Sequence, residues 1–155
     1  MFRRILVANR GEIARRIIST LHKLKIESVA VYDEREKNAS YVQQANLSDS
    51  LGEGPLDETF LNSNKLLFIA KANNCDAIHP GYGFLAENPD FAKRCEEEKI
   101  TFIGPSHDAI YRMGHKTIAK DLARQHNVPL LGGSPGAVSN AEEARTIANE
   151  IGYPV

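Results

Sequence analysis

Residues 4–32 read RILVANRGEIARRIISTLHKLKIESVAVY, and this stretch decides the fold class. In residues 4–8, Arg4 is followed by an apolar, partly β-branched run that ends at a turn over residues 9–11, which is typical of a short buried strand. Residues 28–32 form a second run of this kind. The apolar positions between the two runs recur at helical spacing: Ile13, Ile17, Leu21 and Leu24. Strand, helix and strand in this order predict a βαβ unit with parallel strands.

The same alternation continues to about residue 105. Further strands are predicted at residues 49–51, 77–79 and 101–103, and helices at residues 41–46, at 61–73 and from Asn88-Pro89 onward. The residues of the second of these helices expected to pack are Leu61, Phe68, Ile69 and Ala72. This order predicts an α/β fold: an open, parallel, Rossmann-like sheet with helices on both faces.

The character of the chain changes after residue 105. Helices are predicted at residues 106–113 and 117–126, and a third begins at a capping box formed by Ser139 and Glu142. Residues 153–155 resemble the opening of a strand. We therefore expect a domain at residues 1–112, the start of a second at 113–155, and a chain that is a fragment of a longer protein.

Composition narrows the function classes. The 155 residues are 42% apolar and 25% charged, and 19 Lys and Arg against 20 Asp and Glu give a net charge of −1. This balance excludes a strongly basic nucleic-acid binder and an acidic disordered tail. Cys75 and Cys95 form no C-x-x-C pair, and no apolar run is long enough for a membrane span or a signal peptide. A cytoplasmic, small-molecule protein is the expectation.

Two turns could bind ligands. The turn at residues 9–12 opens a helix, and Asp33 follows about twenty residues later, as in dinucleotide binders. The G-x-G-x-x-G pattern is absent, so the expectation is a plain tight turn at Gly11, with Glu12 complementing the helix N-terminus. The second turn, residues 79–88, leaves a central strand and carries His79, Tyr82, Glu87 and Asn88. From spacing alone it can bind a ligand or pack Phe84 and Leu85 into the core.

Lys116 follows Gly114 near a helix start and could reach a phosphate, although most such lysines are solvated. Residues 132–136 have the composition of a phosphate loop but lack its G-K-[ST] ending, so a flexible connection is the expectation.

Five segments together resemble the biotin carboxylases. They are residues 5–14, ILVANRGEIA; 76–88, DAIHPGYGFLAEN; 101–106, TFIGPS; 113–116, MGHK; and 151–155, IGYPV. The resemblance covers the whole chain in the family's order and spacing. It implies an N-terminal pre-ATP-grasp domain followed by the start of an ATP-grasp domain. It also implies use of ATP, Mg²⁺ (or Mn²⁺) and bicarbonate to carboxylate biotin carried on a lysine of a carrier domain.

The resemblance also implies roles for single residues. Lys116 matches a lysine that reaches ATP, and Tyr82, Gly83 and Glu87 match the loop that borders the biotin end of the site. Arg16 matches a position at the homodimer interface of some bacterial members, although it can equally be a solvated helix residue. No complete catalytic set and no metal-binding carboxylate pair is expected within the chain, so the fragment alone should be inactive.

Two other readings stay open. The chain could be a non-catalytic module for dimerisation or carrier-domain docking, or a Rossmann-type nicotinamide nucleotide binder. The sequence does not reveal which acceptor receives the carboxyl group, nor the oligomeric state.

Overall fold

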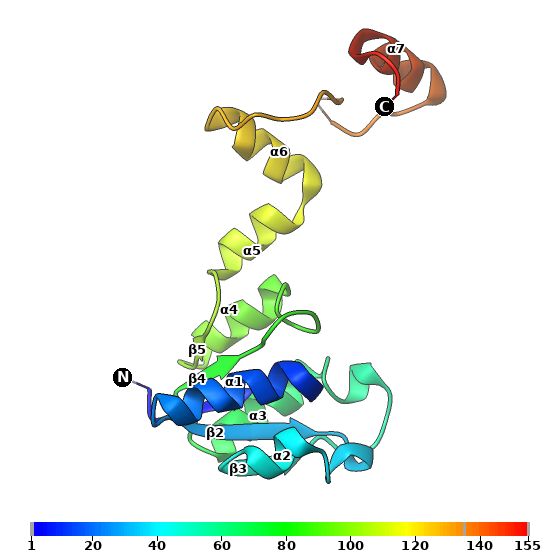
Figure 1. The fold of residues 1–155 in the computed structure, drawn as a ribbon. Coiled ribbons are helices and arrows are strands. Elements are labelled where there is room, and N and C mark those ends of the chain that lie inside the picture. The colour runs from blue at the N-terminus through cyan, green and yellow to red at the C-terminus, as the bar shows by residue number, and fades with distance from the viewer. Residues whose placement is uncertain (1, 135, 155) are drawn as a thin grey trace. The chain divides into compact units, whose positions relative to one another are not determined.

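The computed structural model describes residues 2–134 and 136–154. The chain divides into two compact units, residues 1–110 and 111–155, each of which is described by itself. The first unit is built on one sheet in the order β3-β2-β1-β4-β5 (Figure 1). Its strands are β1 (Arg4–Val7), β2 (Glu27–Tyr32), β3 (Leu47–Ser50), β4 (Ala77–His79) and β5 (Thr101–Phe102), and every pairing is parallel.

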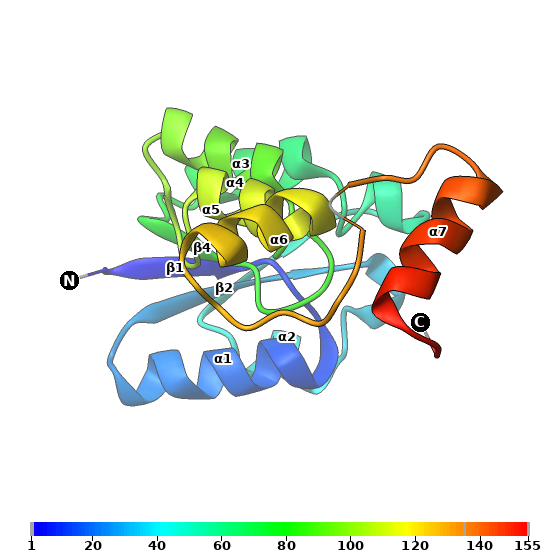
Figure 2. The ribbon, with the colours of Figure 1, turned by 90° about the horizontal axis from the view of Figure 1, so that it is seen from above.

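Helices cover both faces of this sheet. Figure 2 shows two of them on one face, α1 (Gly11–Lys23) and α2 (Ser40–Gln44). On the opposite face lie α3 (Ser63–Ala72) and α4 (Pro89–Glu97). Short 3₁₀ turns, η1 (Glu34–Glu36) and η2 (Leu56–Glu58), complete the connections. The predicted open parallel α/β sheet is therefore confirmed.

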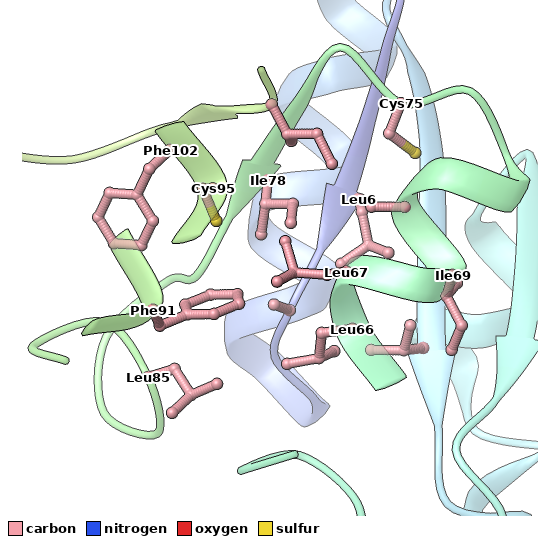
Figure 3. Close-up of a cluster of buried hydrophobic side chains, with 14 of the residues drawn as sticks. Leu6, Leu66, Leu67, Ile69, Cys75, Ile78, Leu85, Phe91, Cys95 and Phe102 are labelled. Carbon is pink, nitrogen blue, oxygen red and sulfur yellow. The ribbon is translucent and has the colours of Figure 1, made fainter. Parts of the chain in front are cut away.

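The alternation of side chains along β1 explains the two layers. Ile5 and Val7 pack in one cluster with Ile17 and Leu21 of α1. Leu6 points the other way and joins the cluster under α3 and α4, where Figure 3 shows it near Leu67 and Ile78. Both faces of the strand are buried, as expected for a strand inside a parallel sheet.

The predicted packing of α3 was wrong in part. Ile69 is buried as expected, but Leu61, Phe68 and Ala72 are exposed, and Phe68 is 72% accessible. The buried stripe is instead Leu66, Leu67 and Ala70, which are neighbours at three- and four-residue spacing on a helix. Residues 66–70 of this helix are all apolar, so the pattern did not identify the buried face.

The start of α4 follows the predicted cap. Asn88 accepts a hydrogen bond from the Phe91 N–H over 2.9 Å, and Pro89 occupies the first helical position, where no N–H is needed. This cap fixes the end of the loop that leaves β4, and so it helps to position the candidate site.

The second unit is helical where it is regular. The division between the units falls within α5 (His107–Gly114), and α6 (Lys116–Gln125) and α7 (Ala141–Ile151) follow. The cap of α7 is Asn140, not Ser139: Asn140 accepts the N–H groups of Glu142 and Glu143, and Glu143 accepts the Ser139 N–H.

The expected strand at the end of the chain is not present at residues 153–154, and Val155 lies outside the described residues. Residues 132–134 and 136 belong to no helix or strand, and the remaining member of the glycine-rich segment, Pro135, is not described. Among the described residues no helix combines the length and apolarity needed to cross a membrane.

Candidate functional site

The loop that follows β4 is fastened to the end of β1 by a buried asparagine. Asn9 is fully buried, and its Nδ2 donates to the carbonyl oxygens of Pro80 at 2.8 Å and Tyr82 at 3.0 Å. Its Oδ1 accepts the Arg10 N–H over 2.9 Å. In the order β3-β2-β1-β4-β5, the strand order reverses between β1 and β4. Open α/β sheets bind ligands at the carboxyl ends of the strands at such a point. Asn9 therefore sets the path of the loop at that point.

Two glycines shape this loop in different ways. Gly81 has φ of +69°, and a Cβ there would come within 2.7 Å of the Ile13 Cγ2 and 2.8 Å of the Asn9 Nδ2. Gly83 has φ of +71°, but a Cβ there would meet nothing within 4 Å. Gly81 is thus required for close packing of the loop on β1, whereas Gly83 lies at the open surface that a ligand could approach.

Tyr82 lies between these glycines, and its hydroxyl donates to the Glu12 carboxylate. The Oη–Oε1 distance is 2.6 Å, and the residue is 56% exposed. This hydrogen bond, with the negative charge of Glu12, raises the pKa of Tyr82. Arg16, one turn further along α1, is exposed, and its charge opposes that shift. The structure therefore brings the predicted interface residue and the predicted loop residue onto one surface.

His79 ends β4 beneath this surface. The Gly81 N–H donates to its Nδ1 over 3.1 Å, so that ring nitrogen carries no proton. Burial lowers the pKa of His79, and the positive charge of Arg16 lowers it further. His79 is therefore a neutral imidazole that supports the loop backbone at neutral pH.

The outer part of the loop rests on an aromatic pair. Phe84 has a left-handed backbone, with φ of +41°, which is costly for a residue with a side chain. Its ring stacks on Phe60 with the centroids 5.2 Å apart, and Arg10 lies 6.0 Å above the Phe60 ring. Leu85 is buried. Phe84 and Leu85 therefore pack as the sequence allowed, while Tyr82 and Glu87 in the same loop are exposed.

Glu87 is exposed in the turn that precedes the Asn88 cap. The sequence thus located Tyr82, Gly83 and Glu87 in one loop correctly, but it did not identify Asn9 or Glu12 as the residues that hold this loop. Their contacts span 71 to 73 and 70 positions of sequence, so no local pattern could have signalled them.

Asp33 does not present a free carboxylate. Its two oxygens accept from the Nε and Nη2 of Arg35 at 2.7 and 2.6 Å, and this pairing holds the pKa of Asp33 far below its ordinary range. A pocket of about 480 Å³ lies beside Asp33, and both Arg35 and Arg10 line it. Arg10 forms an ion pair with Glu36. The carboxylate that the nicotinamide reading would assign to a ribose is therefore engaged by Arg35.

Lys116 lies in the second unit, at the first position of α6. Its side chain is exposed, and His115, the residue before it, makes no side-chain cap. The structure thus places Lys116 at a helix N-terminus and on a surface where an anion could reach it.

No group of three or more His, Cys, Asp or Glu residues that could hold a metal ion occurs within residues 2–134 and 136–154.

Comparison with known proteins shows the family of the chain. The model of the biotin carboxylase N-terminal domain matches residues 1–110. Over all 155 residues the chain is 51% identical to Biotin carboxylase 1 of Bacillus subtilis, of which it covers 34%. The chain therefore spans about a third of the length of such relatives.

Solved structures agree. The chain resembles the biotin carboxylase domain dimer of the Hydrogenobacter thermophilus 2-oxoglutarate carboxylase in complex with MgADP, ADP and bicarbonate, with a TM-score of 0.93 and 47% identity over 99% of this chain and 34% of that one. It also resembles a Campylobacter jejuni biotin carboxylase complex with β-γ-ATP, with a TM-score of 0.94 and 41% identity over the same shares. The chain belongs to the biotin carboxylase N-terminal domain family.

Proposed function

We propose that this chain is the N-terminal part of an ATP-dependent biotin carboxylase. In the full-length protein, a bicarbonate oxygen attacks the γ-phosphorus of ATP, which gives ADP and carboxyphosphate. Carboxyphosphate breaks down to CO₂ and phosphate. The ureido nitrogen of biotin gives its proton to this phosphate and forms a bond to the carbon of CO₂, which yields carboxybiotin. The observation that carries this proposal is the match of all 155 residues, at 51% identity, to a biotin carboxylase.

In this proposal, the loop after β4 borders the biotin end of the site. Tyr82 and Gly83 are exposed, while Asn9 holds the backbone around them. A loop fixed in this way can contribute shape and backbone groups to a ligand without losing entropy on binding. Glu87, exposed at the end of the same loop, is available to hold neighbouring charged groups.

Lys116 supplies a phosphate contact. An ammonium at a helix N-terminus adds its full charge to the partial positive charge of the helix dipole. It would therefore stabilise negative charge on the phosphate that is transferred. Mg²⁺ neutralises phosphate charge when it is bound. Its ligands would come from the part of a full-length biotin carboxylase that this chain does not cover.

The test is an ADP-release assay on the full-length protein, with biotin and bicarbonate left out in turn. ADP release that requires both biotin and bicarbonate supports the proposal. ADP release at the same rate with and without biotin contradicts it. The 155-residue chain is assayed in parallel and should release no ADP. Turnover by this chain would show that the site is complete within it and would contradict the assignment of the remaining groups to a longer protein.

A second candidate role is homodimer or carrier-domain docking through α1. It is favoured by the exposure of Arg16 and by the dimeric state of the related Hydrogenobacter thermophilus domain. Light scattering after size exclusion tests it: a dimer that Arg16→Glu converts to monomer supports the role, while a wild-type monomer opposes it. Lys23→Glu, at the end of the same helix, is the matched charge reversal.

A further inference from the structure

Tyr82 is held at two points by the segment that follows β1. Its backbone carbonyl accepts from the Asn9 Nδ2 at 3.0 Å, and its hydroxyl donates to the Glu12 Oε1 at 2.6 Å. The first contact fixes the backbone of the loop, and the second fixes the direction of the side chain. Both partners lie more than 60 positions away in sequence, so the contacts depend on the assembled fold.

The second contact is unusual for an exposed residue. Tyr82 is 56% exposed and lies between two glycines with positive φ, so little packing restrains its ring. A hydrogen bond from a phenol to a carboxylate is charge-assisted and is stronger than a neutral one. It therefore holds the accessible ring in one orientation before any ligand arrives.

We propose that Glu12 is a positioning residue for biotin, acting through the hydroxyl of Tyr82; this inference rests on the biotin carboxylase function proposed above. Glu12 orients the aromatic ring against which the biotin end of the substrate packs. Without this carboxylate, the ring must be ordered when biotin binds, and the lost side-chain entropy weakens biotin binding.

The other charged neighbour cannot replace Glu12. Arg16 follows Glu12 by one helical turn, and its charge acts on both Tyr82 and His79. A guanidinium has only donors, so it cannot accept the phenolic proton. The acceptor for the proton of the Tyr82 hydroxyl is therefore the Glu12 carboxylate.

The experiment is a double-mutant cycle in the full-length protein, with KM for biotin and KM for ATP measured separately. Glu12→Ala is expected to raise KM for biotin roughly three- to tenfold and to leave KM for ATP unchanged. Glu12→Gln keeps an oxygen acceptor and should restore most of the loss. Glu97→Ala, at the far end of α4, is the control for removal of an exposed carboxylate.

Tyr82→Phe completes the cycle and keeps the proposal testable if one variant folds poorly. It should raise KM for biotin as Glu12→Ala does, and the double variant should show no further increase. An unchanged KM for biotin in Glu12→Ala, or a Glu12→Ala effect that persists in the Tyr82→Phe background, overturns the inference. If the wild type shows no biotin-dependent turnover, the proposed function fails instead.

Discussion

Asn9 at the end of β1 donates from its Nδ2 to the carbonyl oxygen of Pro80 over 2.8 Å, although 71 positions separate the two residues. The same side chain also binds the Tyr82 carbonyl and the Arg10 N–H, so it serves three buried or half-buried groups at once. A fully buried amide with all of these contacts links the first strand to the loop that carries the candidate site.

Asn9→Ala should therefore destabilise the chain by about 1–3 kcal/mol, because it leaves three backbone groups without their partner. Urea denaturation of the 155-residue chain measures the change. Asn38→Ala removes an exposed amide instead and should stay within about 0.5 kcal/mol of the wild type. Equal effects of the two variants would show that Asn9 does not hold the loop.

Gly81 and Gly83 form a matched pair for a second prediction. Both have positive φ, but a Cβ at Gly81 would clash with Ile13 and Asn9, whereas one at Gly83 has open space. We expect Gly83→Ala to cost roughly 1–2 kcal/mol for the backbone conformation, and Gly81→Ala to cost about 1–3 kcal/mol more for the clash. The same denaturation series checks the order, and a larger effect at Gly83 would contradict this description of the loop.

Acid should weaken the chain through Asp33. Hydrogen bonds from Arg35 lower the pKa of Asp33 in the folded state from the ordinary value of 3.8. A lowered folded pKa stabilises the protein fully above the unfolded pKa, and this contribution is lost as the pH falls below about 4. The stability difference between wild type and Asp33→Asn should therefore shrink between pH 6 and pH 2.5. Arg35→Gln should reduce the same pH dependence but not abolish it, because the backbone N–H of residue 35 still donates to Asp33. A difference that grows toward low pH would refute the pairing.

Lys116→Ala in the full-length protein should lower kcat/KM for ATP roughly 10- to 100-fold, because a charged contact to phosphate is lost. KM for biotin should change little. Lys23→Ala, near the end of α1, is the control for loss of an exposed lysine and should leave the kinetics for ATP unchanged. Unchanged kinetics in Lys116→Ala would remove the phosphate assignment.

Patterns within short stretches predicted the elements well. The strand at residues 77–79 matches β4, and the Asn88 cap forms as its sequence indicates. These features depend on neighbours along the chain. Phe68 shows the limit, because α3 is apolar on more than one side and its buried face is chosen by the sheet beneath it.

The candidate site was predictable in part for the same reason. Tyr82, Gly83 and Glu87 share one loop, so a single motif identified them. The roles of Asn9, Glu12 and Arg35 depend on hydrogen-bond partners. Asn9 and Glu12 find theirs through long-range contacts, and Arg35 closes on Asp33 only when the turn after β2 forms. The sequence placed the turn at residues 9–12 and Asp33 near strand ends but could not show what each side chain binds.

The central claim is that these residues form the N-terminal third of a biotin carboxylase. Its most direct test is a chimera in which residues 1–155 replace the matched third of Biotin carboxylase 1 from Bacillus subtilis, with which they are 51% identical. We expect a folded chimera whose ADP release requires both biotin and bicarbonate. A chimera that folds and binds ATP, but releases no ADP in the presence of biotin and bicarbonate, would contradict it.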